Sequence, residues 1–138
     1  MLLDTDALDD APAGRLEAAV RHVLADAGVT EAEVSLTLLD DDAIRALNLE
    51  WLAHDRPTDV IAFALDDDGV LGDVYLGVEQ AGRQAAELGV PLDEELVRLA
   101  VHGTLHVLGH DHPEGPERAV SPMFELQERL VREVLARA

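Results

Sequence analysis

Cysteine and lysine are both absent from the 138-residue sequence, and aromatic residues make up only 3% of it. Without cysteine the chain has no disulfides, no thiolate zinc sites and no cysteine nucleophile. No apolar run approaches the roughly 20 residues that span a bilayer. The first ten residues, MLLDTDALDD, are acidic where a secretory signal would be basic. We therefore expect a cytoplasmic protein with no membrane partner.

All ten basic residues are arginines, and 29 acidic residues oppose them, so the formal net charge is −19. This balance argues against a protein that holds nucleic acid over its whole surface. A small arginine-lined site remains compatible with it, because exposed charges are screened over about 8 Å at physiological salt. The length and the 48% hydrophobic content predict one domain, residues 1–138, with a real core.

Apolar spacing predicts an α+β fold in which helices pack on a small mixed sheet. Helices are expected at residues 15–27, 41–51, 79–88, 92–108 and 117–137, and strands at 33–38, 60–65 and 70–78. Residues 4–14 are expected to form a loop, and residues 66–69 the turn of a hairpin. Asp40 or Asp41 is expected to cap the second helix and Asp93 the fourth. Trp51 is expected to pack against the core rather than to stack on nucleobases.

Four of the six histidines lie within the eleven residues HGTLHVLGHDH, residues 102–112. A helix places His102 and His106 on one face, one turn apart. Gly109 can end that helix in a left-handed conformation, and the returning chain can bring His112 to the other two rings. Three neutral imidazoles suit one Zn²⁺ ion whose fourth position stays open for water. The sequence therefore predicts a zinc-binding helix that ends in a glycine turn.

Other interpretations of these histidines remain open. They can be separate surface or core residues, or His110 or Asp111 can close the site as a fourth ligand of a structural zinc. The spacing also matches the zinc-protease pattern HExxHxxGxxH, except that Gly103 replaces the glutamate that acts as general base. Without that carboxylate, peptide hydrolysis loses its usual proton acceptor.

The histidine segment resembles the HGxLHLxGHDH signature of the YbeY endoribonucleases. Upstream, DRPTDVIAF (residues 55–63) resembles that family's D-x-P-T-D-V-L-S-F segment, and GDVYL (residues 72–76) resembles its G-D-I-x-I strand. The three blocks occur in the family's order, and the resemblance extends from about Val34 to the carboxyl terminus. Two departures concern substrate contact: Leu52 replaces an arginine found in many members, and the family's S-F-P becomes Ala62-Phe63-Ala64.

The resemblance implies a metal-dependent, single-strand-specific endoribonuclease. Its expected roles are processing of the small-subunit ribosomal RNA 3′ end and ribosome quality control. The metal ligands that it implies are His102, His106 and His112. Because the strong negative charge opposes encounter with RNA, a ribosomal protein or an assembly GTPase is a further expected partner.

Asp111 and His110 are the catalytic candidates. Asp111 can orient a ligand or move a proton, although it can equally be a carboxylate that stabilises the turn. His110 can assist proton transfer or simply face solvent. Neither role is decided by the sequence.

Arg56, Thr58 and Asp59 are the substrate-binding candidates. Arg56 can contact phosphate in place of the missing arginine, and Arg83 and Arg98 are further candidates for that contact. Thr58 and Asp59 can line a pocket or form local hydrogen bonds after Pro57.

Two functions from other classes remain as alternatives. One is a noncatalytic ribosome-assembly adaptor that retains a structural zinc. The other is a zinc hydrolase of peptides or small molecules.

Overall fold

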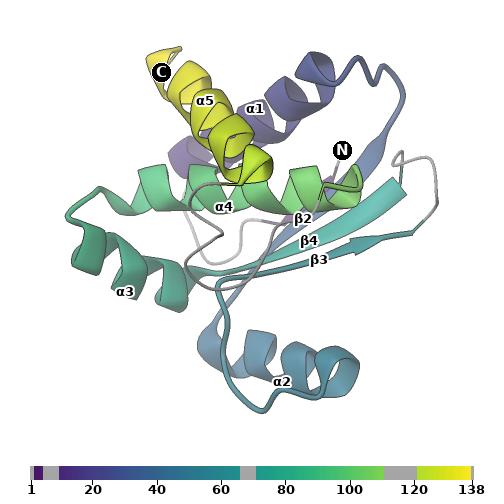
Figure 1. Cartoon of the computed structure of the whole chain (residues 1–138). Helices are drawn as coiled ribbons and strands as arrows, with labels where there is room; N and C mark the ends of the chain where they lie inside the picture. The colour runs from purple at the N-terminus through teal and green to yellow at the C-terminus, as the bar shows by residue number, and fades with distance from the viewer. Residues whose placement is uncertain (1, 5–9, 66–70, 111–120, 138) are drawn as a thin grey trace.

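The computed structural model describes residues 2–4, 10–65, 71–110 and 121–137. Within these residues a four-stranded sheet, with strand order β1-β2-β4-β3, is combined with five helices (Figure 1). The strands are β1 (Leu2–Asp4), β2 (Glu33–Leu39), β3 (Val60–Ala64) and β4 (Leu71–Gly77). The helices are α1 (Asp10–Asp26), α2 (Asp41–Leu52), α3 (Val78–Leu88), α4 (Leu92–Val107) and α5 (Pro122–Ala136). No helix in this part of the chain is long and apolar enough to cross a membrane.

The sheet is mixed, as the sequence predicts. Strands β1 and β4 run parallel to β2, whereas β3 runs antiparallel to β4. The expected hairpin pairing of β3 with β4 is thereby confirmed, while its turn at residues 66–69 lies outside the described residues. Because β3 is the last strand in the order, one of its edges carries no strand among the described residues.

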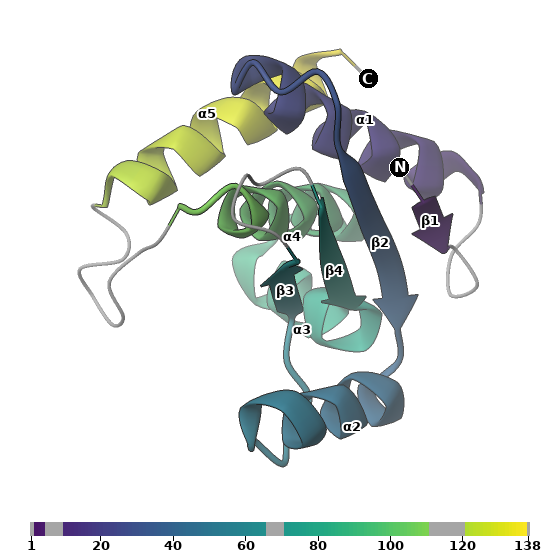
Figure 2. The same cartoon turned by 90° about the vertical axis from the view of Figure 1, so that its right-hand side faces the viewer.

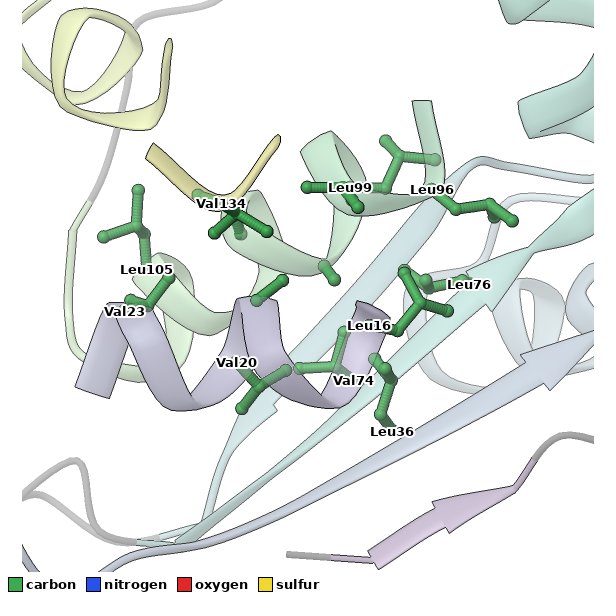
Figure 3. Close-up of a cluster of buried hydrophobic side chains, with 14 of the residues drawn as sticks. Leu16, Val20, Val23, Leu36, Val74, Leu76, Leu96, Leu99, Leu105 and Val134 are labelled. Atoms are coloured by element: carbon green, nitrogen blue, oxygen red, sulfur yellow. The ribbon is translucent and has the colours of Figure 1, made fainter. Parts of the chain in front are cut away.

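The core lies between the sheet and the layer of helices α1, α4 and α5, and α2 lies on the opposite side of the sheet (Figures 1 and 2). In β2 the buried residues alternate with partly exposed ones, as the period-two pattern predicts. Figure 3 shows the side chains that meet in this core: Leu16, Val20 and Val23 of α1; Leu36, Val74 and Leu76 of the sheet; Leu96, Leu99 and Leu105 of α4; Val134 of α5. Helix α4 is therefore enclosed on nearly every side.

Two glycines allow α4 to lie very close to the sheet. A Cβ atom on Gly103 of α4 would lie 2.6 Å from Val74 Cγ1, and a Cβ on Gly72 of β4 would lie 2.5 Å from Val107 Cγ1. Such distances are far below ordinary carbon–carbon contact. The backbone of α4 is thus held directly against β3 and β4.

The expectation of a loop over residues 4–14 is wrong at both ends of that range, while residues 5–9 lie outside the described residues. Residues 2–4 form β1, which pairs with β2, and α1 begins at Asp10. Pro12 is compatible with this start, because backbone N–H groups in the first turn of a helix have no partner within it. The pairing that creates β1 depends on a strand some thirty residues away, which local sequence patterns do not reveal.

The expected cap of α2 is confirmed, and the expected cap of α4 is wrong. Asp40 caps α2, because its side chain accepts a hydrogen bond from the Ala43 N–H at 2.8 Å. Asp93 does not cap α4: Pro91 occupies the cap position, and the Asp93 carboxylate forms an ion pair with Arg15 instead. Helix α5 begins after Ser121, whose hydroxyl accepts from the Phe124 N–H, and its expected first residues, 117–120, lie outside the described part.

Candidate metal centre

His102 and His106 face each other from consecutive turns of α4. Their Nε2 atoms are 3.1 Å apart, and their ring centroids are separated by 4.6 Å with the planes 77° apart. His102 is buried, and His106 is partly exposed. The i, i+4 spacing predicts this convergence, and the structure confirms it.

Gln127 of α5 is the hydrogen-bond partner of the other His102 nitrogen. Its Oε1 lies 2.6 Å from His102 Nδ1, and its Nε2 donates to Glu128 Oε2 at 3.0 Å. Gln127 is buried on the otherwise apolar face of α5. Sequence reasoning missed it, although a polar side chain within an apolar helical stripe is a signal of a specific internal partner.

The two imidazoles fit a divalent cation. In tetrahedral zinc sites with Zn–N distances of about 2.0–2.1 Å, two ligand nitrogens are ~3.3 Å apart, close to the observed 3.1 Å. A ring that donates from Nδ1 keeps its Nε2 lone pair for a metal. The third expected ligand, His112, and the candidate Asp111 lie outside the described residues. Within those that are described, no cluster of three potential ligands occurs, so the complete ligand set stays a prediction.

The helix ends where the sequence predicts. Gly109 has φ 96°, and its N–H donates to the His106 carbonyl at 3.0 Å. The His110 N–H then donates to the Leu105 carbonyl. The His110 side chain is exposed, which agrees with the solvent-facing interpretation and leaves its catalytic role a prediction.

Thr58 and Asp59 make the local hydrogen bonds expected of a turn. The Thr58 hydroxyl and the Val60 N–H both donate to Asp59 Oδ1, at 3.3 and 2.8 Å. The next residue, Val60, packs against α4. If Gly103 carried a Cβ atom, that atom would lie 3.2 Å from Val60 Cγ2. The segment is therefore adjacent to the histidine-bearing turns, and substrate binding by either side chain stays a prediction.

The candidate arginines differ in availability. Arg83 donates to both Asp41 oxygens, at 2.9 and 2.8 Å, and Arg98 is enclosed by three glutamates of α4 and α5. The Arg56 side chain is exposed and, in the part of the chain that the structure describes, has no ion pair. Of these three, Arg56 is the one free to contact phosphate.

Trp51 is not packed in the core, contrary to expectation. The residue is 62% exposed, although it lies at helical spacing from the buried Ile44 and Asn48 of the same helix, because it is one residue from the end of α2. It meets Phe63 edge-on at 6.1 Å, and Phe63 meets Tyr75 at 6.2 Å.

These rings line a largely apolar cleft of about 270 Å³. Its lining residues are Leu47, Trp51, Phe63, Ala64, Leu65, Asp73 and Tyr75. Asp73 and Tyr75 alternate along β4 with Val74, which faces α4, so the cleft opens on the other side of the sheet. Burial raises the pKa of the Tyr75 phenol, and the nearby Asp73 carboxylate adds to the increase.

Comparison with known proteins decides the family. The family model described as Endoribonuclease YbeY matches residues 4–135. The chain belongs to the YbeY endoribonuclease family.

Individual YbeY relatives are similar in sequence to this chain over most of its length. The Endoribonuclease YbeY of Persephonella marina is 38% identical over 122 residues, covering 84% of this chain and 79% of the relative. The Endoribonuclease YbeY of Micrococcus luteus is 42% identical over 139 residues, covering 93% of this chain and 87% of the relative. The solution structure of TM1509 from Thermotoga maritima superposes with a TM-score of 0.74 at 27% identity, covering 99% of this chain and 89% of that one.

The departures from the YbeY pattern cluster at β3 and the end of α2. Leu52 is the last residue of α2 and is 46% exposed. Ala62 and Ala64 lie on β3, opposite Val74 and Gly72 of β4. Leu52 therefore places an apolar side chain at the surface where many members carry an arginine.

Gly103 separates this YbeY chain from the zinc proteases whose histidine spacing it shares. The 2.6 Å approach to Val74 leaves no room for a side chain at this position. A glutamate here would collide with the sheet, so the position that carries the protease general base cannot carry one in this fold.

Proposed function

We propose that this chain is a metal-dependent endoribonuclease that cleaves single-stranded RNA, using one zinc ion held by His102, His106 and His112. Membership of the YbeY family supports the reaction class. The observation that carries the metal site is the 3.1 Å approach of the His102 and His106 Nε2 atoms on one face of α4. We place the activity in the cytoplasm, in maturation of the small-subunit ribosomal RNA 3′ end and in ribosome quality control.

The chain's own residues have distinct roles in this proposal. A bound zinc ion supplies a Lewis acid that polarises a phosphoryl oxygen or activates a water. Gln127 Oε1 accepts a hydrogen bond from the His102 Nδ1–H and so orients that ring toward the metal position. Asp111 and His110 follow the last turn of α4, where they are proposed to orient a ligand and move protons. Arg56, Thr58 and Asp59 are proposed to contact the RNA beside α4.

The electrostatics of the chain bear on how RNA arrives. With a net charge of −19 and with Arg83 and Arg98 held by carboxylates, few cations are available for long-range attraction. A ribosomal protein or an assembly GTPase that presents the RNA is therefore part of the proposal. Binding driven by phosphate contacts weakens steeply with salt, whereas recruitment through protein contacts gives a flat response.

The experiment combines metal analysis with RNA cleavage. Purified wild type, His106→Ala and the control His54→Ala, an exposed histidine outside α4, are assayed for bound zinc and for cleavage of structured ribosomal RNA. Loss of both zinc and cleavage in His106→Ala alone supports the proposal. Zinc without cleavage in the wild type indicates the noncatalytic adaptor, and turnover of peptides indicates the zinc hydrolase.

A further inference from the structure

A chain of hydrogen bonds runs from His102 into the contact between α4 and α5. His102 Nδ1 meets Gln127 Oε1, and Gln127 Nε2 donates to Glu128 Oε2. Arg98 of α4 is the last member of this chain of hydrogen bonds. Its Nε donates to Glu128 Oε2 at 3.0 Å, and its Nη2 donates to Glu128 Oε1 at 3.1 Å. His102 and Gln127 are both buried, so solvent does not replace these partners freely.

Glu128 decides which end of the Gln127 amide faces His102. An ionised carboxylate only accepts hydrogen bonds, so the amide NH2 must point to Glu128 and the amide oxygen to the imidazole. Burial raises the pKa of Glu128, but hydrogen bonds from Arg98 and Gln127 together with the positive charges of Arg98 and Arg132 outweigh burial and lower the pKa overall. The carboxylate is therefore ionised at neutral pH, and the orientation of the amide follows.

The orientation of the amide in turn decides where His102 carries its proton. The Gln127 oxygen can only accept, so Nδ1 must be the protonated nitrogen and Nε2 keeps its lone pair. That lone pair lies on the side of His106, 3.1 Å from its Nε2. Two lone pairs cannot form a hydrogen bond, so a hydrogen bond between these two nitrogens requires His106 Nε2 to be the donor.

We infer that Glu128, held by Arg98, positions His102 as a metal ligand by fixing the Gln127 amide and, through it, the imidazole tautomer. The inference rests on the metal site of the proposed function and adds Glu128 and Arg98 to Gln127 as residues that position His102. None of the three touches the metal: each acts through the next. Arg98 is thereby reassigned from a candidate phosphate contact to a structural part of the metal centre.

The first test needs no substitution. Long-range ¹H–¹⁵N NMR on the metal-free protein, labelled at histidine nitrogen, reports the protonated nitrogen of each ring. We expect His102 to be protonated at Nδ1. His102 protonated at Nε2 would overturn the inference.

The second test measures zinc affinity by competition with a coloured chelator. In Glu128→Gln the new amide both donates and accepts, so Gln127 is no longer forced into one orientation. We expect mixed His102 tautomers and an affinity lower by about 10- to 100-fold, the usual effect of losing a partner behind a metal ligand. Glu133→Gln is the matched control, because Glu133 is also an ion-paired carboxylate of α5 but contacts His22 and Arg129. Equal affinities for Glu128→Gln and wild type would contradict the inference.

A double-substitution cycle tests whether Glu128 acts through Gln127. Gln127→Leu removes the amide, so adding Glu128→Gln to it is expected to lower zinc affinity no further. Effects that multiply would show that Glu128 acts by another route, and would overturn the inference. Because tautomers and zinc affinity are measured without RNA, a protein that binds zinc as expected but leaves RNA intact would refute the proposed function alone.

Discussion

Gly103 and Val74 meet where α4 crosses the sheet, with room for a hydrogen atom but not for a methyl group between them. The contact holds the turn that carries His102 and His106 against β4. It also explains why a residue of low helix propensity lies in the middle of a buried helix.

Replacing Gly103 with alanine is expected to destabilise the protein. Alanine normally gains about 0.5–1 kcal/mol over glycine inside a helix, but overpacking of a close-packed core costs about 1–3 kcal/mol. We expect a net loss of roughly 1–2 kcal/mol in the free energy of unfolding, measured by urea titration. Gly82→Ala on α3, where an added Cβ meets nothing within 4 Å, is the control and is expected to be neutral or stabilising. A stabilised Gly103→Ala protein would show that α4 can move away from the sheet at little cost.

Substitution of Trp51 tests its exposed position. With 62% of the residue exposed and one edge contact to Phe63, Trp51→Ala is expected to lower the free energy of unfolding by less than about 1.5 kcal/mol. Leu36→Ala provides the comparison, because Leu36 is 0% exposed and truncation of a buried leucine costs about 2–5 kcal/mol. Equal losses for the two variants would place Trp51 in the core after all.

The contribution of Glu128 to stability is expected to disappear in acid. The pKa of Glu128 in the folded protein is below its ordinary value of 4.5, so the unfolded chain binds more protons between the two values. The stabilisation is therefore fully present above pH 4.5 and is lost as the pH falls through the folded pKa. The difference in unfolding free energy between wild type and Glu128→Gln should be largest at neutral pH and shrink as the pH falls below 4.5. A difference that does not vary with pH would contradict the prediction.

Zinc is expected to raise the melting temperature of the metal-free protein. A ligand that binds only the folded state stabilises it by about 2.7 kcal/mol at 100 times its dissociation constant. Thermal unfolding with and without zinc measures the shift. His106→Ala should abolish it, His54→Ala should retain it, and a chelator should reverse it. A shift that persists in His106→Ala would place the zinc elsewhere in the protein.

The parts of the structure that follow local patterns could be predicted from the sequence. The alternation of Val34 and Leu36 identifies β2, and Gly89 and Gly109 mark the ends of α3 and α4, where both adopt positive φ. The placement of His102 opposite His106 follows from helical periodicity alone.

Features that depend on distant partners could not be predicted in this way. Residues 2–4 form strand β1 because they pair with the backbone of β2. Trp51 is exposed because of the way α2 packs on the sheet. Gln127 is 25 residues from His102 in sequence, so no pattern in the histidine segment indicates it. Local chemistry predicted the candidate ligands, and only the tertiary structure revealed that Gln127 lies beside His102.

The bond between α4 and α5 also sets an order of events during synthesis. A chain emerging from the ribosome exposes its amino-terminal elements first, so the two histidines of α4 are outside before Gln127 of α5 has been released. Until α5 has emerged and docked on α4, His102 lacks the Gln127 acceptor for its Nδ1 proton. The proposed centre therefore depends on α5, and a nascent or truncated copy that lacks α5 carries the two histidines of α4 without the partner that orients His102.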